Sequence, residues 1–416
     1  MPSPNHRDRL AKPGYSPTVQ LVDAYGLETT SGSVAAVERL DWLVDGFVTF
    51  AVDAPERLRE AVSGDAPPLA HIALGYMLIQ AHTAADHLRA TEAARRVADA
   101  DLNERERMHL EALTAWLAGD LDLTTDIWDS LLLRWPTDML ALRLQHFRLF
   151  NRGRLDAMLN SVRRSIDAWG DAPRRTYLSG MEAFAHEELG NYDTAERLGR
   201  AATEADPADL WSVHSVAHVL EMQGRAEDGL DWFDGRADVL HSSGSFARHL
   251  WWHHAIIYLR TESYDRMLEL YDTEIQPADA TDGLSLTNAI DLLARLEYAG
   301  VDVGDRWDPL LDGASARLGY HDQPFNDAHY AYALARAGDA ASAARLLDGM
   351  AAWQDRSGTA AEVITEVGLD TATAMVALGF GRTAEAKDLL AQGQSERWKL
   401  GGSHAQRRVF DLAQQI

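Results

Sequence analysis

The stretch Gly190-Asn191-Tyr192-Asp193-Thr194-Ala195, followed by Ala202 and Pro207, decides the fold. Gly190 suits a tight turn between two helices, because glycine adopts backbone conformations that other residues avoid. Tyr192 and Ala195 lie where the two helices would cross, and small alanines let paired helices approach closely. Pro207 suits a helix start, where no intrahelical N–H donor is needed. The stretch therefore predicts a helix, a tight turn and a second helix.

The same turn recurs along the chain at a nearly constant interval. Turn residues stand at positions 119, 153, 190, 224, 262, 300, 338 and 381, so that successive intervals are 34, 37, 34, 38, 38, 38 and 43 residues. This interval, with the pattern Gly-x-Tyr-x-x-Ala…Ala…Pro, is typical of the tetratricopeptide repeat. Between turns, apolar residues follow the spacing i, i+3, i+4, as in Leu284 to Tyr298, so helices fill the repeats.

These repeats predict an all-α protein without a sheet, a right-handed tetratricopeptide-like α-solenoid of about ten helix pairs. Residues 1–33 are predicted to form a flexible N-terminal arm, because the first part of this range is polar and rich in proline. Residues 34–416 are predicted to form a single helical-repeat array, which fits the repeat pattern best over about 100–345. A capping helix is expected at about 396–416, since an exposed end repeat would leave its apolar face wet.

The composition excludes several kinds of partner and ligand. The formal net charge of −25 argues against binding to nucleic acids or to anionic membranes, which both need a basic surface. No apolar stretch is long enough for a transmembrane helix, and no apolar segment typical of a secretion signal is found near the N-terminus. The chain has no cysteine, which suits a cytoplasmic protein and leaves His, Asp and Glu as the available metal ligands.

Two histidine pairs have the four-residue spacing that places side chains on one face of a helix. His214 and His218 are followed by Glu221 on the same face, and His249 and His253 repeat the spacing further along the chain. A stacked array brings equivalent repeat positions together, and two helices that each present imidazoles can build a metal or acid/base site. The alternative is that these histidines are hydrogen-bonded packing residues.

Further ligand-type residues fall at one level of the predicted inner helices. Counting back nine residues from turn positions 262, 300 and 338 gives His253, Asp291 and His329. Without a thiolate, such a set suits Zn, Fe, Mn, Ni or Co. The predicted metal ligands are therefore His214, His218, His249, His253, Asp291 and His329.

Side chains beside these ligands receive the remaining predicted roles. Glu221 has the position of a general base, and orienting a histidine N–H is its alternative role. An ordinary i, i+4 ion pair with Asp291 is the alternative for Arg295. The candidate catalytic residues are Glu221 and His218, and the candidate substrate contacts are Trp252, Asn326 and Arg295.

Three spaced motifs resemble the tetratricopeptide repeat protein 38 family. They are Val213-His214-Ser215-Val216-Ala217-His218 with Glu221-Met222, His249-x-Trp251-Trp252-His253, and Phe325-Asn326-Asp327-Ala328-His329. The resemblance implies a soluble helical-repeat fold, and the family supplies no assigned reaction. Its pattern has an acid near Asn288, where this chain has an amide and offers Asp291 instead.

We expect a solenoid whose concave groove holds a His-rich centre that binds a divalent metal and a small molecule. A metal held by neutral imidazoles lowers the pKa of a bound water and polarises a carbonyl, so a metal-dependent hydrolase is the leading hypothesis. The alternative is a peptide- or protein-binding repeat scaffold without catalysis, because tetratricopeptide arrays commonly bind extended peptides. A metal-free acid/base enzyme that uses the same histidines is a third hypothesis. A homo-oligomer is compatible with the sequence, and the substrate stays open.

Overall fold

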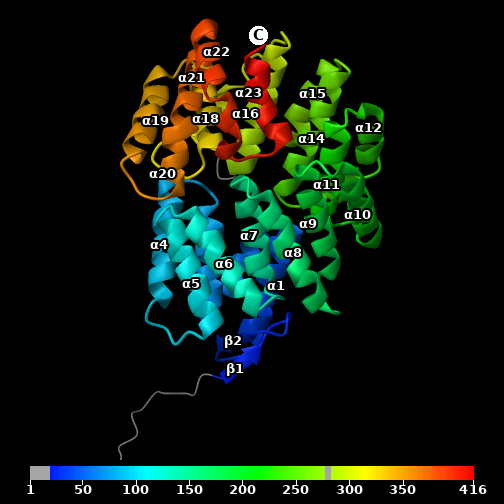
Figure 1. The fold of residues 1–416 in the computed structure, drawn as a ribbon, viewed down its shortest axis with the longest axis vertical. Helices are drawn as coiled ribbons and strands as arrows, with labels where there is room; N and C mark the ends of the chain where they lie inside the picture. The colour runs from blue at the N-terminus through cyan, green and yellow to red at the C-terminus, as the bar shows by residue number, and fades with distance from the viewer. Residues whose placement is uncertain (1–18, 277–282) are drawn as a thin grey trace, which may run out of the picture.

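The structure is a computed structural model, which describes residues 19–276 and 283–416 (Figure 1). Within these residues, ten packed helix pairs follow one another, so the predicted all-α solenoid is confirmed. The pairs are α1–α2 (Val34–Thr49, Ala54–Ala61), α3–α4 (Pro68–Ile79, Ala84–Val97), α5–α6 (Glu104–Leu117, Leu121–Arg134), α7–α8 (Met139–Asn151, Leu155–Trp169), α9–α10 (Arg175–Glu188, Tyr192–Ala205), α11–α12 (Leu210–Met222, Ala226–Asp234), α14–α15 (Phe246–Arg260, Tyr264–Leu270), α16–α17 (Gly283–Tyr298, Leu311–Ser315), α18–α19 (Pro324–Arg336, Ala340–Trp353) and α21–α22 (Leu369–Gly379, Thr383–Gln392). Single elements between or after the pairs are α13 (Ala237–His241), α20 (Thr359–Val363), α23 (His404–Ala413), the π-helical turns η1 (Tyr271–Ile275) and η3 (Ile364–Gly368), and the 3-10 turns η2 (Asp308–Leu310) and η4 (Gln394–Leu400).

The turns predicted from the repeat are left-handed in the structure. The glycines at 119, 153, 190, 224, 300, 338 and 381 all have positive φ, which costs glycine little. Glu262 adopts the same conformation with φ 54° although it is not a glycine. After every one of these turns except Gly300 the second helix of the pair begins two residues later, as α10 does at Tyr192 after Gly190. The repeat pattern therefore located the helix starts as well as the turns.

The first helix of each pair lies on the inside of the array. The inner helices α9, α11, α14, α16, α18 and α21 each contact the next in this order. Every residue of α11 from Leu210 to Glu221 is buried, and so is every residue of α18 from Pro324 to Ala335. A helix buried all round needs partners on every face, and the outer helices and neighbouring inner helices supply them.

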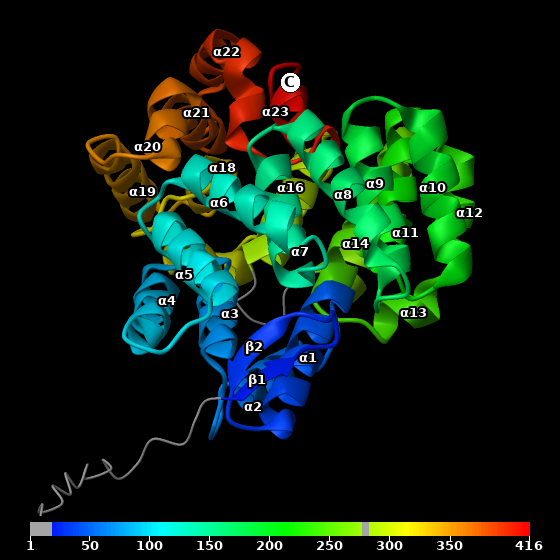
Figure 2. The same ribbon diagram turned by 60° about the horizontal axis from the view of Figure 1, so that its bottom comes forward.

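The array coils so far that its first three helix pairs contact later parts of the chain (Figure 2). The backbone N–H of Leu121, in α6, donates to Thr359 Oγ1 at the start of α20 at 2.7 Å. After α3, His82 Nδ1 lies 2.7 Å from Asp322 Oδ1, just before α18. At the end of α1, the Phe50 carbonyl accepts a hydrogen bond from Gly244 N–H at 2.8 Å. These contacts close the concave side of the solenoid around an interior.

The N-terminal region differs from the prediction. Residues 1–33 were expected to form a flexible arm without sheet; residues 1–18 lie outside the described residues, but β1 (Val19–Val22) and β2 (Glu28–Ser31) form an antiparallel hairpin. Glu106 Oε1 accepts from the backbone N–H of Thr30 at 2.8 Å. Arg105 donates to the Glu28 carbonyl at 3.0 Å and to Thr29 Oγ1 at 2.8 Å. Side chains of α5 therefore stabilise a hairpin whose own sequence did not predict it.

The C-terminal helix is present but lies elsewhere than predicted. Residues 396–416 were expected to cover the last repeat, whereas α23 packs mainly against the inner helices α16 and α11. Arg295 Nη2, in α16, donates to the carbonyl of Ala405 at 2.8 Å. The chain thus returns from its last pair to the concave side and helps to enclose the interior.

Among the helices of the described chain, none combines the length and the apolar character that crossing a membrane requires.

Replacing Arg105 by Ala should destabilise the N-terminal half. The Arg105 guanidinium is buried and lies 3.0 Å from Asp138 and 3.1 Å from Asp23. Its loss leaves the Asp23 carboxylate without an ion pair and Asp138 with His109 as its remaining partner. We expect the free energy of unfolding, measured with urea, to fall by about 3–5 kcal/mol. Arg134→Ala, which breaks an exposed ion pair with Glu104, is the control and should retain near-wild-type stability. Equal losses in both variants would contradict this role of Arg105.

Candidate metal centre

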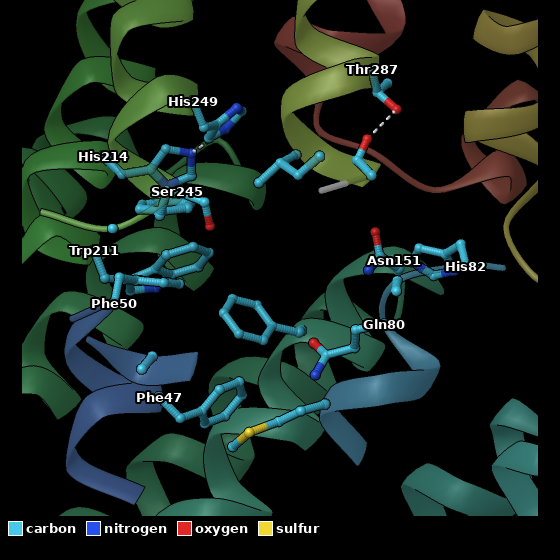
Figure 3. A pocket seen from close by; sticks show the side chains of 18 of the residues that line it. Phe47, Phe50, Gln80, His82, Asn151, Trp211, His214, Ser245, His249 and Thr287 are labelled. Carbon is cyan, nitrogen blue, oxygen red and sulfur yellow. Dashed lines mark hydrogen bonds between the residues drawn. The ribbon is translucent and has the colours of Figure 1, made fainter. Parts of the chain in front are cut away.

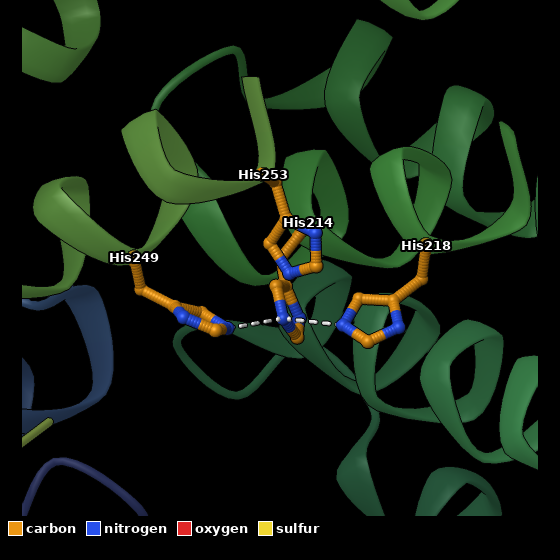
Figure 4. A group of neighbouring side chains, drawn as sticks. All are labelled: His214, His218, His249 and His253. Carbon is orange, nitrogen blue, oxygen red and sulfur yellow. Dashed lines mark hydrogen bonds between the residues drawn. The ribbon is translucent and has the colours of Figure 1, made fainter. Parts of the chain in front are cut away.

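Four histidines from two adjacent inner helices form a buried cluster (Figure 4). His214 and His218 lie one turn apart on α11, and His249 and His253 lie one turn apart on α14. The ring centroids of His214 and His218 are 4.3 Å apart, and those of His218 and His253 are 4.4 Å apart. The i, i+4 spacing aligns each pair on one helix face, and the contact between α11 and α14 brings the two faces together.

The ring nitrogens converge as well as the rings. His214 Nε2 lies 2.9 Å from His218 Nε2 and 3.0 Å from His249 Nε2. One nitrogen from each of the four rings lies within 4.8 Å of those of the other three. Four imidazole nitrogens at such distances have the spacing of ligands around a single metal ion.

Oxygen atoms outside the cluster approach the opposite nitrogen of three of the rings. His253 Nδ1 lies 3.3 Å from Glu221 Oε2, and His249 Nδ1 lies 3.2 Å from Asn288 Oδ1. His218 Nδ1 lies 3.5 Å from Glu187 Oε2. The oxygens of Glu221 and Asn288 accept from Nδ1–H, so we assign the protons of His253 and His249 to Nδ1 and their lone pairs to Nε2. The Glu187 oxygen forms no hydrogen bond with His218, but its proximity favours the same tautomer there. Histidines that bind metals are commonly oriented in this way.

This assignment leaves nitrogen lone pairs facing one another. The Nε2 atoms of His218 and His249 are then both acceptors, and a neutral His214 can direct one N–H toward only one of them. His253 Nε2 also has no hydrogen-bond partner among the described residues. Buried polar atoms are rarely left in this state, and a cation at the centre of the rings satisfies the inward-facing nitrogens.

Burial lowers the pKa of all four histidines, because an imidazolium loses its hydration in the interior. The neighbouring imidazoles lower the pKa of His214, His218 and His253 further, and the pKa of His249 falls to about 4. The rings are therefore neutral near pH 7, which is the form that binds metals. Burial also raises the pKa of Glu221 to about 7.

Asp291 and His329, the other two predicted ligands, lie outside this group. Asp291 Oδ2 accepts from Arg295 Nε at 2.6 Å and from Trp252 Nε1 at 2.7 Å, so Arg295 already neutralises the charge of this carboxylate. His329 Nδ1 donates to the Phe325 carbonyl at 2.8 Å, and its Nε2 lies 3.8 Å from Asp291 Oδ1. The i, i+4 ion pair that was the alternative for Arg295 explains why Asp291 does not reach the histidines.

The cluster borders a cavity of about 600 Å³ (Figure 3). His214, His218 and His249 line the cavity, and so does Asn326, whose Oδ1 accepts from Thr287 Oγ1 at 3.4 Å. Trp252 and Arg295, which were predicted to contact a substrate, do not line it. Trp252 instead stacks on His249 with ring centroids 5.4 Å apart. Of the three predicted substrate contacts, Asn326 alone faces the interior.

Three buried residues beside the cluster were not predicted from the sequence. Asn288 holds His249, although the resemblance had marked only its position. Glu187, in α9, and its neighbour Glu188 form a second group with His218, within 4.8 Å of one another. Burial raises the pKa of Glu187, and the adjacent Glu188 raises it further. Both glutamates lie on the inner helix one repeat before His218, at a position that repeat counting could have reached.

The repeat geometry makes this chain a tetratricopeptide-like helical-repeat protein. No known family model matches the sequence. One similar solved structure is that of a Rap protein in complex with competence and sporulation factor. It is 9% identical, has a TM-score of 0.39, and the match covers 82% of this chain and 99% of that chain. Nothing about the function of this chain follows from a likeness of that size.

Metal-free protein should lose stability as the pH falls from about 6.5 toward 4. The His249 side chain takes up a proton near pH 6.5 when unfolded, but only near pH 4 when folded. In this window the unfolded state binds more protons, so acid favours unfolding, and stability is restored above pH 6.5. The full effect for His249 is about 3 kcal/mol.

Urea unfolding at a series of pH values measures this effect. His249→Gln keeps a polar side chain but cannot be protonated, so the variant should lose less stability between pH 6.5 and 4 than the wild type does. Parallel pH profiles for the two proteins would contradict the burial of a neutral His249.

Proposed function

We propose that His214, His218, His249 and His253 bind one divalent metal ion, and that the protein is a metal-dependent enzyme acting on a small molecule in the adjacent cavity. The convergence of four buried imidazole nitrogens, with hydrogen-bonded oxygens behind two of the rings, carries the proposal. Hydrolysis is the reaction we infer, because it needs only a metal, a water and a polarised carbonyl.

The nitrogen separations support metal binding. Ligands about 2.0–2.1 Å from a tetrahedral Zn²⁺ lie roughly 3.3 Å from one another. The separations in the cluster begin at 2.9 Å, between His214 and His218, and do not exceed 4.8 Å. Small rotations of the rings are enough to reach regular geometry. Imidazole ligands also suit Fe, Mn, Ni and Co, and several of these accept more than four ligands.

The position of the cluster supports catalysis more than a purely structural site. His214, His218 and His249 line the cavity, whereas His253 does not, so the cluster has one face toward the interior space. Four histidines would fill a tetrahedral Zn²⁺ site, so an open position on that face requires a metal that accepts more than four ligands. Such a metal would lower the pKa of a bound water and polarise a substrate carbonyl. Structural metal sites, in contrast, have all their coordination positions filled by protein.

The structure favours a positioning role for Glu221 over the predicted role of base. Its Oε2 lies 3.3 Å from His253 Nδ1, and the residue does not line the cavity. A carboxylate in this position holds the ring orientation and strengthens the ligand. His218 is a ligand in this proposal, and Glu187 Oε2 lies 3.5 Å from its Nδ1.

A small molecule fits the interior better than an extended peptide does. The volume of about 600 Å³ is in the range of small-molecule sites. Helices α1 and α23 contribute residues to its wall, so the concave side is covered and lacks the open groove that a peptide needs. A scaffold that binds peptides is therefore the weaker alternative. We further propose that the chain is related to the tetratricopeptide repeat protein 38 family and functions in the cytoplasm, in keeping with its motifs and its lack of cysteine.

Elemental analysis of protein purified without a histidine tag tests the metal proposal. The wild type should contain close to one divalent metal per chain. His218→Ala and His253→Ala should lose most of it while far-UV circular dichroism stays unchanged, because alanine is the best helix former. Hydrolysis of a substrate, once one is identified, should fall in parallel.

His254→Ala is the matched control. His254 follows His253 on α14, but it stacks on Phe233 and lies outside the cluster, so its variant should keep the metal. A wild type without metal would refute the proposal. A drop in melting temperature for His218→Ala with unchanged metal content would make these histidines packing residues, whose loss costs about 1–3 kcal/mol.

A further inference from the structure

We propose that the cavity binds a monoanionic carboxylic acid with an apolar body, and that Arg148 binds its carboxylate. The proposal rests on the cavity of the proposed function and names its substrate class, but the carboxylate contact itself needs no metal. Arg148 lies in the last turn of α7 and lines the cavity.

Arg148 is a buried cation that forms no ion pair within residues 19–276 and 283–416, and its Nε has no hydrogen-bond partner there. The residue is 5% exposed, and its guanidinium lies 4.8 Å from the centre of the Trp116 ring. Asp322 attracts it electrostatically without pairing with it. Buried arginines are almost always paired, because the desolvation of a charge is expensive. A ligand anion in the cavity supplies the missing partner.

Amide side chains surround the same end of the cavity. Asn151, one turn after Arg148, and Gln323 both line it, and Gln323 Nε2 donates to Asn151 Oδ1 at 3.4 Å. This bond leaves the Asn151 NH₂ group as a donor for a ligand. A small recess lined by Arg148, Asn151 and Gln323 continues outward from here to Arg152 and Lys399. Asp322 lines the same recess, and Arg152 and Lys399 already pair with carboxylates of their own. Arg148 is therefore the cation of this recess that has no ion pair among the described residues.

The opposite end of the cavity holds the histidine cluster. Figure 3 shows His82 and Asn151 across the cavity from His214 and His249. The wall between the two ends is mainly apolar and includes Phe47, Phe50, Phe147, Phe150, Trp211 and Phe246. A ligand that fills this space has an anionic group near Arg148, an apolar body, and its remaining end beside the proposed metal.

The charges near Arg148 favour a monoanion over a phosphate. Asp322 interacts electrostatically with Arg148 without pairing with it, and holds His82 Nδ1 at 2.7 Å. This carboxylate repels a dianion more than a monoanion. A planar carboxylate also matches a guanidinium in two parallel hydrogen bonds. The other unpaired interior guanidinium, Arg143, does not line the cavity and lies behind Phe147 and Trp211.

Calorimetric titration of metal-free protein with octanoate tests the proposal. Octanoate should bind, and octan-1-ol and octylammonium, which share its chain, should bind at least about 10-fold more weakly. Arg148→Gln should weaken octanoate by about 10- to 100-fold and leave octan-1-ol unchanged. Arg154→Gln, which removes an exposed arginine paired with Asp126 just after the same helix, is the control and should bind like the wild type.

The other outcomes separate this inference from the metal proposal. Equal binding of octanoate to wild type and Arg148→Gln overturns the inference, and so does tighter binding of octyl phosphate. The inference is also overturned if octanoate binding requires added Zn²⁺ and is the same with and without Arg148. That outcome does not contradict the metal proposal. If Arg148→Gln does not fold, Asn151→Ala replaces it, with a loss of octanoate affinity again expected. An unchanged affinity in that variant rejects the amide contact and the site with it.

Discussion

Contact between successive inner helices is the constraint on which the rest of the structure depends. The intervals of 34–38 residues between most turns keep equivalent levels of α9, α11, α14 and α16 beside one another. Residues far apart in sequence therefore meet at one level: Glu187, His218, His253 and Asn288 come from four consecutive inner helices. The histidine cluster follows from this stacking, because neither helix alone offers more than two imidazoles on a face.

Closure of the coil changes the electrostatic environment of the stacked residues. In an open solenoid the concave face is wet, and a buried charge there would be screened by water. Here the contacts of Phe50 with Gly244 and of His82 with Asp322 bring the first repeats against later ones. The inner faces then line a cavity and bury the histidines, and electrostatic interactions between buried groups are stronger than in water. Burial lowers the pKa of the histidines and desolvates the Arg148 guanidinium.

The sequence predicts the features that depend on neighbours along the chain. Left-handed turns and i, i+4 pairs are local, so the repeat, the helix starts and the pairing of His214 with His218 followed from spacing alone. The hairpin at residues 19–31 and the position of α23 did not, because contacts with α5 and α16 determine them. Asp291 lies on the inner helix α16, as the repeat count predicted. Its carboxylate pairs with Arg295, one turn away, and therefore does not join the histidine cluster.

The interior concentrates polar groups that the fold itself does not satisfy. His214 Nδ1, His253 Nε2, both carboxylate oxygens of Glu187 and the amide nitrogen of Asn288 lack hydrogen-bond partners among the described residues. Each such group costs about 1–3 kcal/mol, and a core built for stability alone would replace them with apolar side chains. These atoms lie on or beside the histidine cluster, although other buried polar atoms of the described chain, such as those of His146 and His321, also lack partners. Local violations of packing rules that collect at one place are typical of a functional site, and a repeat array tolerates them because each pair is stabilised mainly by its own neighbours.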